Sequence, residues 1–125
     1  GWASHKKLPI LFIIEDNNFS ILTKKSTRRN WNMKDVARSF KLEGHDIKDD
    51  PKEINKYSNL FFKKPTLLNI NTNRIYWHAG AGKDSDKTFD RFKNEKKIIG
   101  SKATKIDDNC KIDIKKLWKS QLEKQ

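Results

Sequence analysis

Four consecutive polar residues, Glu15-Asp16-Asn17-Asn18, follow directly on the apolar run from Leu8 to Ile14. Three kinds of chemistry suit them. Asp and Asn after a strand commonly form an Asx turn with their own backbone. Amide, carboxylate and carbonyl oxygens also suit Mg²⁺, which takes few protein ligands and completes its octahedron with phosphate and water oxygens. A general acid/base pair fits less well, because neighbouring carboxylates on an extended chain point to opposite sides.

The elements that must position this polar segment begin with the apolar run itself. Leu8 to Ile14 is continuously apolar, which predicts a strand covered on both faces in a parallel sheet. Asn32 is an N-cap candidate with Asp35 three residues on, so a short helix is expected from there. A short strand is expected over Phe40 to Gly44, with Gly44 ending it.

The second half of the chain repeats this alternation. Asp50-Pro51 supplies an N-cap followed by a proline at the first helical position, which predicts a helix that stops at Pro65. A buried strand over Thr66 to Asn71 and a loop from Tyr76 to about Lys87 should follow. Residues 112–125 are expected to form a C-terminal helix. The fold class is therefore α/β, in one domain over residues 1–125.

This order of elements also predicts where a site should lie. In open α/β sheets, ligands gather beyond the carboxyl ends of the strands. Glu15–Asn18 and Asn71–His78 both follow strands, so both segments should meet at that edge of the sheet.

The composition bounds the function further. The chain carries 28 Lys and Arg against 16 Asp and Glu, giving a net charge of +12. Binding of nucleic acid is therefore one candidate function. However, most of the cations are Lys, whereas bidentate contacts to bases and phosphates favour Arg. Aromatic residues that would serve as stacking platforms are expected in the core, because they lie on apolar periodic faces: Phe12, Phe61, Phe62 and Trp118. A solvated, Lys-rich surface is the preferred interpretation.

Two features of the sequence bear on where the protein is located in the cell. No apolar run is long enough to cross a bilayer. Cys110 has no second cysteine to pair with, which favours a cytoplasmic setting.

Three segments together resemble a known family. LPILFIIEDNNFSI (8–21) is similar to the end of the thiamine diphosphate-binding motif in the alpha subunit of the decarboxylating component of 2-oxo acid dehydrogenase complexes. LEGHD (42–46) and KPTLLNINTNRIYWH (64–78) resemble the two strands that follow in these pyruvate dehydrogenase-like oxidoreductases, in family order. The resemblance implies a partial three-layer α/β/α thiamine diphosphate-binding fold with a mostly parallel sheet.

The resemblance also implies roles for three residues. The side-chain oxygen of Asn17 and the backbone carbonyl of Phe19 would bind Mg²⁺, which bridges the diphosphate of thiamine diphosphate. His78 would lie against the diphosphate and the reacting centre as a catalytic residue. Without the resemblance, His78 is interpreted as an ordinary polar loop residue. Ala79 stands where regulated members have a Ser, so phosphorylation there is not expected.

The resemblance implies partners as well. The family's second metal ligand lies in a Gly-Asp-Gly segment about thirty residues upstream, in an N-terminal half of the cofactor domain that this chain lacks. The glutamate that activates the cofactor comes from a beta subunit. The implied reaction is decarboxylation of a small 2-oxo acid, with acyl transfer to a lipoyl-bearing acyltransferase or another acceptor. The chain by itself is expected to be inactive. A basic nucleic-acid-binding module and a non-catalytic fragment acting through a partner chain remain as alternatives.

Overall fold

The computed structural model describes residues 1–60, 62–84 and 89–123. It divides into two compact units, Gly1–Phe89 and Asp90–Gln125. The expectation of a single domain over residues 1–125 stays a prediction.

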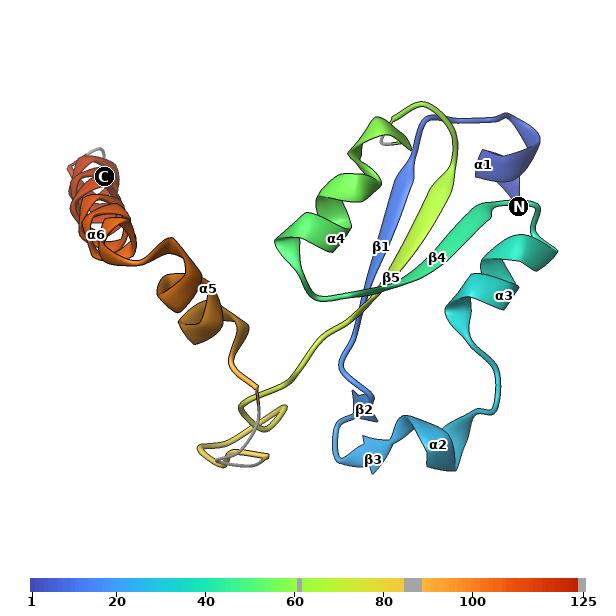
Figure 1. Cartoon of the computed structure of the whole chain (residues 1–125), viewed down its shortest axis with the longest axis horizontal. Coiled ribbons are helices and arrows are strands. Elements are labelled where there is room, and N and C mark those ends of the chain that lie inside the picture. Colours follow the sequence, from blue (N-terminus) through green and yellow to red (C-terminus); the bar gives the residue numbers. More distant parts are fainter. Residues whose placement is uncertain (61, 85–88, 124–125) are drawn as a thin grey trace. The chain divides into compact units, whose positions relative to one another are not determined.

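The first unit is built on a three-stranded parallel sheet in the order β1-β5-β4 (Figure 1). The strands are β1 (Leu11–Asp16), β5 (Thr66–Asn71) and β4 (Glu43–Lys48). Leu11 and Glu43 both pair with Thr66, so the three strands start level with one another. Mixed helices and strands around a parallel sheet confirm the predicted α/β class.

Burial is concentrated in the central strand. Residues 66–70 of β5 are all buried, as expected for a strand with neighbours on both sides. β1 differs from the prediction, because Phe12 and Ile13 are 38% and 57% exposed. The sequence pattern was interpreted as a strand covered on both faces, but β1 lies at an edge of the sheet and is covered only in part.

Helix α3 (Met33–Ser39) begins as predicted: the side-chain oxygen of Asn32 accepts a hydrogen bond from the Asp35 amide at 2.8 Å. The predicted strand over Phe40 to Gly44 was misplaced, because β4 starts at Glu43 and Gly44 lies inside it. A Cβ at Gly44 would lie 2.8 Å from the carbonyl oxygen of Lys34. Gly44 therefore allows α3 to pack closely on β4 instead of ending the strand.

Helix α4 (Pro51–Lys56) also starts at its predicted cap, with the Asp50 carboxylate accepting from the amides of Lys52 and Glu53. It is shorter than predicted and gives way to a 3₁₀ turn, η1 (Ser58–Leu60). Ile54 and Tyr57 pack on a core of Ile47, Leu68 and Ile70. Helices α3 and α4 lie on opposite faces of the sheet (Figure 1), as the general preference for right-handed crossovers predicts for connections that run in opposite directions.

Short elements that were not predicted complete this unit. They are helix α1 (Trp2–His5), the hairpin β2 (Phe19–Ser20) and β3 (Thr23–Lys24), and helix α2 (Lys25–Arg28). The predicted loop is confirmed over residues 76–84, where the backbone holds only an isolated bridge between Tyr76 and Lys83. Its remainder, residues 85–87, lies outside the described residues.

The second unit consists of α5 (Arg91–Ile99) and α6 (Ser101–Leu122), joined at Gly100. The C-terminal helix begins at residue 101 and not at 112, because the apolar spacing extends back through Ile106 to Ala103, which is buried. Lys96 of α5 pairs with Asp107 of α6 at 3.0 Å. Within the described ranges, no helix, including α5 and α6, is both long and apolar enough to span a membrane.

Three of the four aromatic residues expected in the core are exposed instead. Phe12, Phe62 and Trp118 are 38%, 73% and 69% accessible, so that prediction was wrong for these three. Phe61 lies outside the described residues. The periodic pattern correctly predicted the helix that carries Trp118. In the described part of the second unit, however, no other element covers the apolar face of that helix on which Trp118 lies.

Candidate functional site

The two polar segments leave the sheet side by side. Asp16 pairs with Asn71 at the ends of β1 and β5, and the Thr72 amide donates to the Asp16 carbonyl at 3.0 Å. Because the strands are parallel, both segments continue from the carboxyl edge of the sheet. The predicted meeting of these segments at one edge is therefore confirmed at their first residues.

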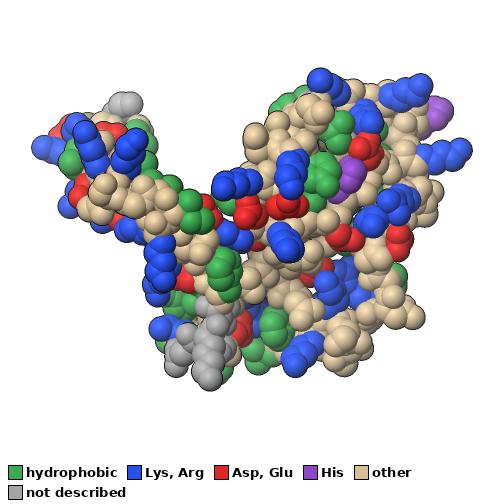
Figure 2. All heavy atoms as spheres, viewed as in Figure 1, with side chains coloured by type: hydrophobic (Ala, Val, Ile, Leu, Met, Phe, Trp, Pro, Cys, Tyr) green, Lys and Arg blue, Asp and Glu red, His purple; other side chains and the backbone are tan. Residues whose placement is uncertain are grey.

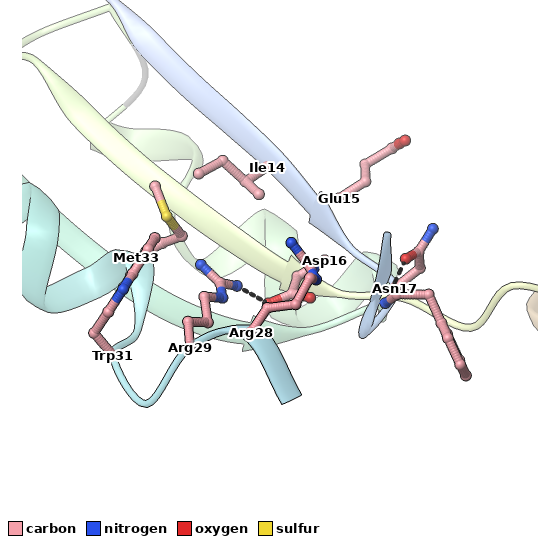
Figure 3. A pocket seen from close by; sticks show the side chains of 9 residues that line it. Ile14, Glu15, Asp16, Asn17, Arg28, Arg29, Trp31 and Met33 are labelled. Atoms are coloured by element: carbon pink, nitrogen blue, oxygen red, sulfur yellow. Dashed lines mark hydrogen bonds and ion pairs between the residues drawn. The ribbon is translucent and has the colours of Figure 1, made fainter. Parts of the chain in front are cut away.

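Asp16 is the electrostatic centre of this edge. Its side chain is 7% exposed, and one of its oxygens accepts from Lys25 Nζ at 2.7 Å. The same oxygen accepts from Arg29 Nη2 at 3.0 Å (Figure 3). The other oxygen accepts from the Asn18 amide at 3.0 Å. Burial raises the pKa of Asp16, but the hydrogen bonds from Lys25 and Asn18 outweigh it and leave that pKa below its ordinary value. The carboxylate is therefore ionised and already neutralised.

Lys25 and Arg29 were missed by the sequence analysis. They reach Asp16 from 9 and 13 residues away, after the chain has turned through the β2–β3 hairpin into α2. The run of cations in Lys24-Lys25 and Arg28-Arg29 was the available signal, since a buried carboxylate requires cations nearby.

Asn17 forms the Asx turn that was one of the three interpretations of the polar run. Its side-chain oxygen accepts from the Phe19 amide at 3.0 Å. Asn18, between them, has φ of 66°, in the left-handed region that Asn tolerates better than most residues. The turn fixes the direction of the Asn17 amide, and its oxygen keeps a second lone pair for another partner.

The Phe19 carbonyl faces the same side as the Asn17 amide. In the antiparallel β2–β3 ladder, Phe19 lies opposite Lys24. The Lys25 amide donates to the Asn18 carbonyl, so Asn18 and Lys25 form the neighbouring hydrogen-bonded pair. Phe19 therefore occupies a non-bonded position, where N–H and C=O both point away from the partner strand. Its N–H reaches Asn17, so its carbonyl is directed to that side as well.

Arg74 connects the second polar segment to this hairpin. Its guanidinium forms two hydrogen bonds to Asp84, at 2.6 and 2.8 Å, and also donates to the Ile21 carbonyl. The same group lies 4.7 Å from the centre of the Phe19 ring. Arg74 thus holds residues 74–84 against the β2–β3 hairpin. His78 lies exposed on this loop, and its catalytic role stays a prediction.

A cavity of about 310 Å³ opens beside Asp16 and Asn17 (Figure 3). Arg29 lines it and lies 4.6 Å from the centre of the Trp31 ring. Glu15 and Asp16 point to opposite sides of β1, which agrees with the weak fit of an acid/base pair. The lining consists of Ile14, Glu15, Asp16, Asn17, Phe19, Arg28, Arg29, Trp31 and Met33.

The donor set fits part of a Mg²⁺ site. One amide oxygen and one backbone carbonyl are hard ligands of the kind Mg²⁺ accepts, while phosphate and water oxygens normally supply most of its shell. Asp16 is not a ligand candidate, because Lys25 and Arg29 occupy it. Over the described ranges, no group of three or more His, Cys, Asp or Glu side chains could hold a metal ion. Asn17 and Phe19 could therefore supply two ligands but not a complete site.

Comparison with known proteins gave no match to a family model, a curated protein or a solved structure.

Proposed function

We propose that this chain is part of a cytoplasmic thiamine diphosphate-dependent 2-oxo acid dehydrogenase or decarboxylase. In this proposal the sheet and its helices belong to a partial three-layer α/β/α cofactor-binding fold. Asn17 and Phe19 would hold Mg²⁺, and together with His78 they would bind the cofactor. The observation that carries the proposal is the hydrogen bond from the Phe19 amide to the Asn17 side-chain oxygen, just beyond the carboxyl end of β1.

The chain's own residues prepare this turn for an ion. The Asx bond to the Phe19 amide fixes the Asn17 side chain before any ion binds, which reduces the conformational entropy lost on binding. Neutralisation of Asp16 by Lys25 and Arg29 prevents that carboxylate from competing for the ion. Asn17 and Phe19 then remain to contact a bridging ion.

Arg74 and His78 have distinct roles in the proposal. Arg74 positions the loop through Asp84 and the Phe19 ring. His78 on that loop would donate a hydrogen bond to the diphosphate or to the reacting centre. When bound, thiamine diphosphate would supply the electron sink for decarboxylation of the 2-oxo acid, and the acyl unit would pass to a lipoyl-bearing acyltransferase or another acceptor.

Partners are required because two ligands do not hold the ion. In this proposal, an N-terminal half with a Gly-Asp-Gly segment supplies the other metal ligand, and a beta subunit supplies the activating glutamate. We therefore expect the chain by itself to bind Mg²⁺ and thiamine diphosphate very weakly.

Titration calorimetry tests the proposal in two arms. Mg²⁺ and thiamine diphosphate are titrated into the chain alone, and into the chain mixed with a polypeptide that carries the Gly-Asp-Gly half and with a beta subunit. We expect saturable binding only in the mixture, and a loss of about tenfold or more in affinity for Asn17→Ala. Asn55→Ala, an exposed residue of α4, is the matched control. Tight binding to the chain alone, or equal affinities for the two variants in the mixture, contradicts the proposal.

A further inference from the structure

A basic cavity lies at the amino-terminal edge of the sheet, the edge opposite to Asn17. Its volume is about 570 Å³, and its lining includes Lys7, Lys41, Lys63 and Lys64. These lysines come from the three segments that enter β1, β4 and β5, which start level with one another. Figure 2 shows Lys and Arg side chains gathered near α1 and the start of β4. The proposed function uses none of them.

The charge of this cavity is strongly positive. Among the described residues that line it, Glu43 is the one carboxylate. Glu43 pairs with Lys64 and lies 2.9 Å from Nε2 of His45. The hydrogen bond from Lys64, with a smaller contribution from the one with His45, holds the pKa of Glu43 below its ordinary value. This carboxylate is therefore ionised at neutral pH. One carboxylate cannot neutralise four ammonium groups, and the cavity therefore attracts anions.

Two of the lysines occupy backbone positions that favour glycine. Lys7 and Lys41 have φ of 51° and 57°, and each follows the C-cap of a helix. The amides of Leu8 and Leu42 donate to Ala3 and Ala37 at 3.0 Å, which is the bonding pattern of a Schellman motif. The left-handed residue of that motif is usually Gly, since a side chain there is strained.

Helix dipoles do not account for this arrangement. A cation near a helix C-terminus is stabilised by the dipole, but α1 and α3 have only four and seven residues. Lys63 and Lys64 precede β5 and follow no α-helix directly. The feature that the four lysines share is the cavity.

We propose that this cavity binds a small molecule that carries three or more phosphate groups, since its four lysines exceed its one carboxylate by three charges. The volume is in the range of small-ligand pockets. Ammonium groups on flexible stems suit phosphates as point charges, and Ser4 and His5 in the lining can donate further hydrogen bonds. The described lining contains no aromatic side chain except the His5 ring, so it offers little for the base stacking that single-stranded nucleic acids require. This inference is independent of the proposed function.

Calorimetric titration of the whole chain with inorganic tripolyphosphate, in buffer without divalent cations, tests the inference. We expect saturable binding that weakens as salt is added. Lys7→Gly and Lys41→Gly each remove one cation and relieve a strained φ. Each should therefore weaken binding about fivefold while leaving the melting temperature unchanged or higher. Lys52→Gln, which removes an exposed cation from α4, should bind as the parent chain does.

Three results would overturn the inference. The first is no saturable binding of tripolyphosphate. The second is equal affinities for Lys41→Gly and Lys52→Gln, which would mean general attraction to a basic surface. The third is tighter binding of a short single-stranded RNA than of tripolyphosphate with the same dependence on Lys41, which would assign the cavity to nucleic acid.

Discussion

Replacing Asp16 by Asn tests how the carboxyl edge of the sheet is stabilised. Lys25 and Arg29 both bind the same oxygen of Asp16, while the Asn18 amide binds the other. In Asp16→Asn, an amide oxygen can still accept from Asn18, but an NH₂ group then faces the two cations. The variant therefore removes the ion pairs and preserves the shape of the turn.

The magnitude follows from the burial of the three side chains. Removing one partner of a fully buried ion pair costs about 3–5 kcal/mol. Here the Asp16 side chain is 7% exposed, but Arg29 and Lys25 are 14% and 31% exposed and can regain part of their hydration. We therefore expect a loss of about 2 kcal/mol in the free energy of unfolding.

Urea denaturation followed by far-ultraviolet circular dichroism measures this loss. Glu53→Gln is the matched control, because it makes the same charge change at an exposed pair with Lys56 and should cost less than about 1 kcal/mol. The pH dependence gives a second measurement. The pKa of folded Asp16 lies below its ordinary value of 3.8, so its stabilising contribution is present above that value and is lost as the pH falls through the folded pKa. Asp16→Asn should weaken this acid sensitivity. Equal costs for the two variants, or an unchanged acid sensitivity, would refute the reasoning.

Two further predictions concern packing and the loop. Gly44→Ala should lower the free energy of unfolding by about 2 kcal/mol, because the new Cβ would lie 2.8 Å from the Lys34 carbonyl oxygen. Thermal melting measures this loss, with Gly1→Ala as the control, and equal melting temperatures for the two variants would contradict the prediction. Arg74→Gln should speed hydrogen exchange at the amides of residues 19–25 and leave the exchange of β5 unchanged, because Arg74 links the loop to the hairpin. Unchanged exchange in the hairpin would show that Arg74 does not hold the hairpin in place.

Features encoded by neighbouring residues could be predicted from the sequence. The caps at Asn32 and Asp50 have the expected hydrogen bonds, because a capping side chain reaches only two or three residues along the chain. The β5 strand has its predicted bounds, Thr66–Asn71, since a run of buried residues flanked by turns has few other interpretations. The Asx turn at Asn17 is equally local.

Features that depend on distant residues could not be predicted. The exposure of β1 follows from its place at the edge of the sheet, which a single strand's sequence does not specify. Gly44 was interpreted as a strand end, but its role depends on the approach of α3. The partners of Asp16 come from another element, so the charge pattern indicated available cations without indicating which carboxylate they would bind.

The central position of β5 has a consequence for the order of folding. β1 and β4 both pair with β5, so the three-stranded parallel sheet cannot form until residues 66–71 are available. β4 and β5 are separated by the short α4 segment, whereas β1 must close a loop of more than twice that length. The difference in loop-closure entropy is about 0.8 kcal/mol in favour of the shorter connection. We therefore expect the β4–α4–β5 segment to assemble as the nucleus, with the strand that leads to Asn17 docking afterwards.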